Sequence, residues 1–443
     1  MIKSELALLG GTPVLTKKLP GYNSIAIGRE EEQAVLRVIR SKNLSGFLGL
    51  GAKEFWGGPF VRKFEKEFGR YFKIRYALSF NSATTALQAA VAALGIGPGD
   101  EVITSPFTMS ATPASVLLNN AVPVFADIDL QTYCLSAESI EKRITKRTKA
   151  ILAVNLFGGS ADYGPILRLA RKRHLKVIED NAQAPGATYR GRFTGTIGDI
   201  GVFSFNVHKH IQSGEGGMLV TNNKSYAYRA ALARNHGEVA ADDWSGRGKF
   251  FRELIIGSNY RLTEIQAAIL SAQLKKLQNL NQQRIILADY LTKRLKKFYW
   301  LAPVSVLPKS RHVYYLYPIK FFGKKLGLGR KIFAMALAAE GFELEEGYQK
   351  PLYLLRTYQK KQIYPRSRFP FIAREYQQKV DYRTGICPVA ERMYREELFV
   401  TNLCQPPKTK KFIDLFVGAL EKIERNVKAL KTYERKRIRS SKA

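Results

Sequence analysis

Apolar and polar positions follow two different patterns between residues 76 and 205. Short apolar runs, typical of buried strands, alternate with longer segments whose apolar residues recur at helical spacing. Strands are predicted at YALSF (76–80), DEVITSP (100–106), VPVFADI (122–128), AILAVNLFG (150–158) and LKVIED (175–180), and helices at ATTALQAAVAALGI (83–96), SATPASVLLNN (110–120) and PILRLARKRH (165–174). This alternation predicts an α/β fold whose mostly parallel central sheet carries helices on both faces.

A smaller α+β domain is predicted after this sheet. A long helical pattern from Leu262 to Leu295 leads to HVYYLYPIKFF (312–322), which reads as a strand. Further helices are predicted at Glu30–Ser41, Lys331–Glu340 and Phe412–Leu430. The expected organisation is an N-terminal arm (1–30), a large domain (31–280) and a small C-terminal domain (281–443) that contains an irregular insertion around 347–385 and ends in a basic tail.

Length and charge narrow the class of protein. With 443 residues, 45% of them hydrophobic, the chain can bury more than one core, which excludes a disordered protein. The formal net charge of +34 raises a polyanion as a partner. The bases are dispersed, with local excesses in RLARKRHLK (168–176) and from Lys428 to Lys442, and aromatic residues are not interleaved with them. Solvated basic faces are therefore favoured over a specific nucleic-acid partner.

The cysteines and the longest apolar runs exclude other classes. Cys134, Cys387 and Cys404 are odd in number and widely spaced, so neither a disulfide framework nor a zinc site is expected. A reducing compartment is expected instead. The first twenty residues lack the apolar stretch of a secretion signal, and no apolar run is long enough to span a membrane. We expect a soluble, cytoplasmic protein without a metal.

One lysine stands where chemistry is expected. In FSFNVHKHIQSGEGG (203–217), Lys209 follows an apolar strand-like run and precedes a glycine-rich turn. A neutral lysine amine holds a carbonyl group as an imine, and burial or nearby cations favour the neutral form. His208 and His210 are candidates for such cations, although sequence neighbours on a strand face opposite sides. Asp180 ends the strand LKVIED, where a carboxylate can keep the ring nitrogen of a pyridine cofactor protonated.

An anion site is predicted beside these two residues. Ligands of α/β sheets bind beyond the carboxyl ends of the strands, where Ser204 and the segment Ser105–Thr108 also fall. In NSATTALQAA the backbone N–H groups at the start of a helix can hold a phosphate, and those groups belong to Ala83, Thr84 and Thr85. The glycines of GEGG (214–217) let the backbone pass close to a ligand or a partner chain.

Several segments together resemble one enzyme family. EDNAQAPGA, GDIGVFSFNVHKHIQSGEGGMLVTNN, RNHG and GSNYRLTEIQAAI are similar to the DegT/DnrJ/EryC1/StrS family of pyridoxal-phosphate sugar aminotransferases, and the similarity runs from LALLGGTPV to ICPVAERMYREELFV. The resemblance implies an aspartate-aminotransferase-like fold of fold type I. It also implies pyridoxal 5'-phosphate as cofactor and a homodimer with its sites at the subunit interface.

The resemblance assigns roles to individual residues. Lys209, five residues after Ser204, corresponds to the lysine that binds the cofactor, and Asp180 to the acid at the pyridine nitrogen. Gln183 would lie beside the 3-hydroxyl group. The phosphate would be held by Ser204 with Ala83, Thr84 and Thr85 of this chain, and by Asn259 of the other subunit. Met109 stands where many members place an aromatic ring over the cofactor.

The resemblance leaves alternatives open. Members with a histidine in place of the lysine dehydrate sugars, but aligning His208 or His210 there needs a one-residue slip, and Gln183 agrees with a transaminase. The amino donor is expected to be glutamate or glutamine, and the acceptor a keto-sugar, most simply one linked to a nucleoside diphosphate. A keto-inositol is the nearest alternative acceptor, and a non-catalytic regulatory or polyanion-binding protein on the same scaffold is the alternative of another class.

Overall fold

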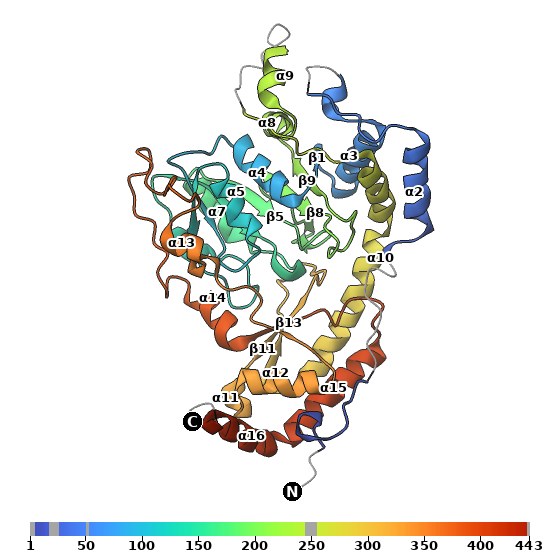
Figure 1. Cartoon of the computed structure of the whole chain (residues 1–443), viewed down its shortest axis with the longest axis vertical. Helices are drawn as coiled ribbons and strands as arrows, with labels where there is room; N and C mark the ends of the chain where they lie inside the picture. The colour runs from blue at the N-terminus through green and yellow to red at the C-terminus, as the bar shows by residue number, and fades with distance from the viewer. Residues whose placement is uncertain (1–4, 17–25, 50–52, 244–254, 441–443) are drawn as a thin grey trace.

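A seven-stranded sheet forms the centre of the computed structural model, which describes residues 5–16, 26–49, 53–243 and 255–440 (Figure 1). The strand order is β1-β9-β8-β5-β4-β2-β3. Every neighbouring pair is parallel except those that involve β9, which is antiparallel to both β1 and β8. The strands are β1 (Tyr76–Phe80), β2 (Glu101–Thr104), β3 (Val122–Phe125), β4 (Thr148–Val154), β5 (Lys176–Asp180), β8 (Ile200–Ser204) and β9 (Gly217–Thr221). The predicted fold class is confirmed.

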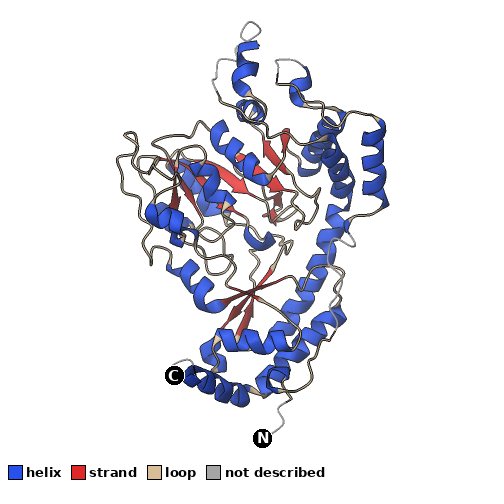
Figure 2. Cartoon of the chain, viewed as in Figure 1, coloured by secondary structure: helices blue, strands red, loops and turns tan. Residues whose placement is uncertain are grey.

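Helices cover both faces of this sheet (Figure 2). Successive side chains of a strand point to opposite faces. Accordingly, Val202 of β8 packs with α4 (Ala83–Ala93) and α8 (Lys224–Arg234), whereas Phe203 packs with α3 (Pro59–Phe72) and the first half of α10 (Glu264–Leu295). Strands buried on both faces carry no polar alternation, which is why they appear in the sequence as continuous apolar runs.

The long helix α10 connects two parts of the protein. Leu270, Leu274, Leu277 and Leu280 pack in the core that lies against the large sheet. Further along the helix, its leucines belong to the core of a second, four-stranded sheet, and these are Leu287, Leu291 and Leu295. The predicted long helix over 262–295 is thus present from Glu264 to Leu295, and the predicted domain limits at 30 and 280 remain predictions.

The second sheet has the strand order β10-β11-β13-β12, with antiparallel pairs throughout. Its strands are β10 (Leu301–Pro303), β11 (Tyr317–Phe321), β12 (Glu345–Glu346) and β13 (Leu398–Thr401), and its helices include α11 (Gly323–Leu326), α12 (Arg330–Ala339), α15 (Lys410–Arg425) and α16 (Val427–Ser440). Two predictions need correction. The strand predicted over 312–322 begins only at Tyr317, because the preceding residues bind the turn after β4. The helix predicted over 412–430 ends at Arg425, where Asn426 leaves helical geometry and caps it.

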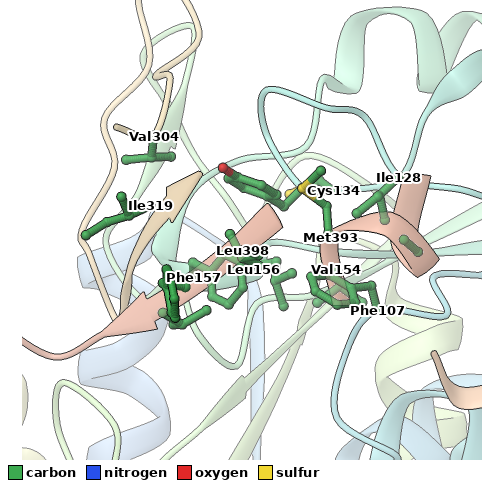
Figure 3. Packing of buried hydrophobic residues seen from close by; sticks show 14 of the residues in the cluster. Phe107, Ile128, Cys134, Val154, Leu156, Phe157, Val304, Ile319, Met393 and Leu398 are labelled. Atoms are coloured by element: carbon green, nitrogen blue, oxygen red, sulfur yellow. The ribbon is translucent and has the colours of Figure 1, made fainter. Parts of the chain in front are cut away.

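The two sheets share one hydrophobic core at their junction (Figure 3). Leu156 and Phe157, which follow β4 of the large sheet, pack in the same cluster as Ile319 of β11 and Leu398 of β13. Each of these side chains has at most 1% of its surface exposed. A continuous apolar junction of this kind fixes the segments that cross it relative to the large sheet.

The N-terminal arm packs on the second unit. Residues 7–9 form a short 3-10 helix, and the backbone N–H groups of Ala7 and Val14 donate to the carboxylate of Glu340 on the end of α12 at 2.9 and 3.1 Å. The same buried carboxylate pairs with Lys422 of α15 at 2.8 Å. The described part of the arm, residues 5–16, is therefore attached to the C-terminal unit at Ala7 and Val14, and residues 1–4 and 17–25 lie outside the described part.

The insertion at 347–385 covers the edge of the large sheet. β3 is the last strand of that sheet, and Tyr382 OH donates to Pro123 O of β3 at 2.6 Å. Phe125 of β3 lies among the rings of Tyr353, Tyr358 and Tyr382. The insertion is irregular as predicted, apart from a 3-10 turn at Leu352–Leu354 and α13 (Arg356–Lys360).

The remaining elements are short, with the exception of α2. They are α2 (Arg29–Arg40), the 3-10 turns Lys53–Trp56 and Leu156–Gly158, α5 (Ala111–Leu117), α6 (Ala137–Glu141), α7 (Tyr163–Lys172), the β6–β7 hairpin (Thr188–Tyr189 and Arg192–Phe193), α9 (Gly237–Asp243), α14 (Pro388–Arg392) and the π-helical turn Met393–Glu397. In the part of the chain that the structure describes, every helix is too short or too polar to cross a membrane.

Candidate active site

Asp180 and Ser204 lie at one edge of the large sheet. They end β5 and β8, which are parallel neighbours with Asp180 opposite Val202. Both side chains are buried. In sheets of this type, ligands bind outside the carboxyl ends of the strands, so this edge is the place to look for the site.

The carboxylate of Asp180 is held by two hydrogen bonds. Thr112 Oγ1 of α5 donates to Asp180 Oδ2 at 2.8 Å, and Ala182 N donates to Oδ1 at 3.1 Å. Burial raises the pKa of Asp180, while these two hydrogen bonds and the charge of Lys209 lower it. A carboxylate in such a place is stabilised further by a cationic partner, for example a protonated ring nitrogen.

Lys209 lies on the loop after β8, close enough to Asp180 for the two charges to interact. Its side chain is partly buried, and its ammonium nitrogen lies 4.4 Å from the centre of the Tyr315 ring. Burial lowers the pKa of Lys209 to about 8, against the opposing charge of Asp180. A substantial share of this amine is therefore neutral near pH 8, which is the form that attacks a carbonyl.

The two histidines beside Lys209 lie in different environments. His208 is exposed, whereas His210 is buried and its Nε2 donates to the carbonyl of Val313 at 3.0 Å. Burial, helped by the charge of Arg284, lowers the pKa of His210 well below its usual value, so this side chain is neutral. Of the two influences expected from the sequence, burial is the one that lowers the pKa of Lys209.

The start of α4, where the anion site is predicted, is capped by its own side chains. Ser82 caps the helix, and its Oγ accepts from Thr85 N at 3.2 Å, while Thr85 Oγ1 donates to Asn81 Oδ1 at 2.7 Å. Both polar groups of Thr85 are thus committed to the cap. Ala83 and Thr84 occupy the first turn, whose N–H groups have no partner within a helix, and they carry the phosphate prediction.

Gly217 explains part of the GEGG motif. A Cβ at this position would lie 2.4 Å from Ser82 O and 2.6 Å from Ala83 N, distances that side-chain carbons do not adopt. Glycine at the start of β9 therefore lets this strand pass directly against the N-terminus of α4. The close approach joins two segments of the same chain, in addition to the ligand or partner contact expected from the sequence.

Gln183 lies buried between the two sheets. Its Oε1 accepts from Phe157 N at 2.8 Å, and its Nε2 donates to Tyr348 OH at 2.9 Å. Tyr348 contacts the rings of Phe107 and Phe157 edge-on. The second Nε2 hydrogen of Gln183 can still be offered to a ligand hydroxyl group.

Asn259 and Met109 lie at the periphery of this arrangement. Asn259 is exposed; its Oδ1 accepts from Arg261 Nε at 2.7 Å, and its backbone carbonyl accepts from Asn81 Nδ2 at 3.5 Å. Met109 is 56% exposed in the turn before α5. Their predicted roles, a phosphate contact from the other subunit and a cover for the cofactor ring, stay predictions.

The sequence analysis did not identify three residues that lie at the site. Thr112 binds Asp180, Tyr315 contacts Lys209 and Tyr348 binds Gln183. Thr112 could have been found, because it stands one helical turn after Thr108 in a segment already placed at a strand end. The two tyrosines come from the second unit, and only the folded chain brings them to this edge.

These groups fit pyridoxal phosphate. A buried carboxylate with a raised pKa suits a protonated pyridine nitrogen, and an amine with a lowered pKa suits an aldehyde. The start of α4 suits a phosphate, and the cleared space around Gly217 keeps that helix end against the sheet. The ring nitrogen of the cofactor is thus matched by Asp180 and its aldehyde by Lys209. The phosphate is matched by Ala83 with Thr84, and the 3-hydroxyl group by Gln183.

Comparison with known proteins agrees with this chemistry. Residues 47–399 match the DegT/DnrJ/EryC1/StrS aminotransferase family. The chain is 34% identical over 403 residues to L-glutamine:2-deoxy-scyllo-inosose aminotransferase of Streptoalloteichus tenebrarius, which covers 88% of this chain and 91% of that protein. It is 39% identical over 302 residues to GDP-perosamine synthase of Caulobacter vibrioides, covering 68% and 79%.

The fold is shared with solved enzymes. The X-ray structure of the aminotransferase from Psychrobacter cryohalolentis superposes with a TM-score of 0.77 at 30% identity, covering 93% of this chain and all of that one. The family uses pyridoxal phosphate, as the site predicts. The protein therefore belongs to the DegT/DnrJ/EryC1/StrS aminotransferase family, and it is a pyridoxal-phosphate-dependent aminotransferase.

Proposed function

We propose that the protein transfers the amino group of L-glutamate or L-glutamine to a keto-sugar, most simply one linked to a nucleoside diphosphate. The observation that carries this proposal is the pairing of Lys209 with Asp180. The pKa of the amine is lowered to about 8 and the pKa of the acid is raised, both mainly by burial, and their charges interact. This pair supplies the nucleophile and the ring-nitrogen partner that amino transfer needs.

The residues divide the work between them. Bound pyridoxal phosphate supplies an electron sink for the α-carbon of the donor. Asp180 keeps a proton on the pyridine nitrogen, and Thr112 and Ala182 hold its carboxylate in place. With the cofactor bound, Lys209 Nζ would take the proton from the donor α-carbon as a base and would hold it for return as an acid. With the keto-sugar, the same amine moves the proton in the opposite direction.

A nucleotide-linked acceptor is supported by a relative and by charge. GDP-perosamine synthase is named for a nucleotide sugar. In this chain the insertion contains Tyr348, which binds Gln183, and it carries exposed bases suited to a diphosphate. These bases are Lys350, Arg356, Lys360, Arg366 and Arg368. We propose that the insertion contributes to acceptor choice.

A keto-inositol is the second candidate acceptor. The scyllo-inosose aminotransferase is similar over 88% of this chain, whereas the similarity to GDP-perosamine synthase covers 68%. A cyclitol has no diphosphate, so it would not need the exposed bases of the insertion. A kinetic comparison of both acceptor classes with glutamate and with glutamine decides between them.

We further propose a cytoplasmic homodimer with shared sites. Exposed Asn259 binds Asn81 just before α4, and exposed Met109 lies in the turn before α5. We propose that a second subunit completes the site at these two places. Mixing inactive Lys209→Ala and Asn259→Ala chains should restore part of the activity, because one intact site forms in each mixed dimer. Mixed dimers without any recovered activity would contradict shared sites.

The central test is chemical trapping at Lys209. A preparation loaded with pyridoxal phosphate should be yellow, and borohydride should fix the cofactor to the peptide that contains Lys209. Lys209→Ala should abolish trapping and turnover, while Lys224→Ala, an exposed lysine on α8, should change neither. Salt-dependent retention on DNA or heparin by a protein that takes up no cofactor would instead support the non-catalytic alternative.

A further inference from the structure

The flanking of Lys209 by histidine is not explained by the chemistry described so far. His210 is buried, and burial lowers its pKa well below the usual value, so this side chain is neutral. Its Nε2 donates to Val313 O, on the segment that enters the site from the second unit. Two residues further on, this segment carries Tyr315, whose ring lies under the ammonium group of Lys209.

The segment that carries Tyr315 is fixed at several points. Val313 N donates to Gly158 O at 2.8 Å, and Gln405 Nε2 donates to Tyr315 O at 3.0 Å. Gly158 has a φ of +97°, and a Cβ there would lie 2.7 Å from the backbone nitrogen of Tyr315. The hydrogen bond from His210 to Val313 O adds a further contact, between this segment and the loop that carries Lys209. The backbone that carries the Tyr315 ring is therefore fixed by the turn after β4, by Gln405 and by the lysine loop.

A cation 4.4 Å from an aromatic centre is attracted by the negative face of the ring. When Lys209 Nζ takes the proton from the donor α-carbon, the C–H electron pair stays with the substrate and the amine becomes an ammonium ion. Burial opposes that charge, and the carboxylate of Asp180 favours it. Attraction to a ring at a partly desolvated site is large enough to change such an equilibrium about tenfold.

We propose that the ring of Tyr315 stabilises the positive charge that Lys209 acquires during proton transfer, and that His210 is a positioning residue that holds the ring in place. The inference rests on the function proposed above, in which Lys209 moves the proton. Other titratable groups face this pair. The charge of Asp180 acts on Lys209, the charges of Arg284 and Glu345 act on Tyr315, and Tyr348 interacts with both Tyr315 and Asp180. None of them changes in the variants below, so they act equally in all.

The test compares Tyr315→Leu, which removes the ring, with Tyr315→Phe, which keeps it. The first readout is the pH at which Lys209 is protonated in enzyme converted by L-glutamate or L-glutamine to the aminated cofactor form, measured by acylation and peptide mapping across pH. The second is the exchange of the donor α-proton in deuterated water, followed by NMR. Both use the loaded enzyme, and trapping with borohydride first verifies that the cofactor is attached at Lys209.

Tyr315→Leu should slow α-proton exchange about tenfold and let Lys209 lose its proton at lower pH, with the donor KM changed less than twofold. Tyr315→Phe should stay within about twofold of the wild type in both readouts, since the ring remains. His210→Leu should change both in the same direction by a smaller factor. His210→Gln, which can still donate to Val313 O, should restore most of the loss.

Two outcomes overturn the inference. A folded, cofactor-loaded Tyr315→Leu protein with wild-type exchange and wild-type Lys209 titration would show that the ring does not act on the charge. Equal losses in Tyr315→Leu and Tyr315→Phe would assign the effect to the hydroxyl group instead. Trapping at a lysine other than Lys209 would refute the proposed function itself and with it the role of Tyr315, a result distinct from the other two.

Discussion

Replacing Thr112 by valine tests how the site holds Asp180. The two side chains have the same shape, so the change removes one hydroxyl group from a buried position and leaves α5 packed. The lost hydrogen bond is 2.8 Å long and has a charged acceptor. Hydrogen bonds to charged groups contribute about 1.5–3 kcal/mol, and each 1.4 kcal/mol is tenfold in rate. We expect kcat to fall by roughly 10- to 150-fold.

The pH dependence of Thr112→Val has a definite sign. Burial raises the pKa of Asp180 and the Thr112 hydrogen bond lowers it, so the variant raises this pKa further. Because the reaction needs the carboxylate, the acidic limb of the kcat profile should move to higher pH. Steady-state rates between pH 5 and 9 measure both effects, and Thr112→Ser should retain most of the activity.

A structural control excludes a general effect on the helix. Ser115 lies on the same helix and donates to Thr112 O at 2.7 Å, without contact to Asp180 through a hydrogen bond of the described residues. Ser115→Ala should leave the acidic limb in place. If Thr112→Val works within twofold of the wild type and its acidic limb does not move, the carboxylate does not depend on this hydrogen bond, and the assignment of Thr112 is wrong.

Three further predictions concern stability and reactivity. Gly217→Ala should lower the free energy of unfolding, measured in urea, by about 1–3 kcal/mol, because the new Cβ would overlap the Ser82 backbone. The same change should weaken cofactor binding. The control Gly418→Ala should leave the free energy of unfolding unchanged, because the space around Gly418 is open. Lys422→Met should lower unfolding free energy by about 3–5 kcal/mol, because buried Glu340 loses its cation; unchanged stability would contradict this. Ellman's reagent should not react with the native protein at pH 8, since all three cysteines are buried and burial raises the pKa of Cys134 to about 12; rapid reaction would refute this.

Much of the fold was predictable because its information is local. Strands buried on both faces appear as short apolar runs, and the helices between them show their own spacing, so the parallel sheet follows from the sequence. The strand predicted over 312–322 and the helix predicted over 412–430 failed where local pattern was overruled. Residues 313–316 bind the turn after β4 instead of pairing in a sheet, and Asn426 ends a helix that the apolar spacing would continue.

By itself, the sequence determined the family and which residues are candidates for its chemistry. Lys209, Asp180 and Ser204 stand out because strand ends and glycine-rich turns are visible in one dimension, whereas Gln183 was predicted from the family resemblance. The tertiary structure alone decided what surrounds them. Thr112 reaches Asp180 across 68 positions, and Tyr315 and Tyr348 arrive from the second unit. Such contacts depend on how whole layers pack, and the burial that lowers the pKa of Lys209 exists only once those layers have closed around it.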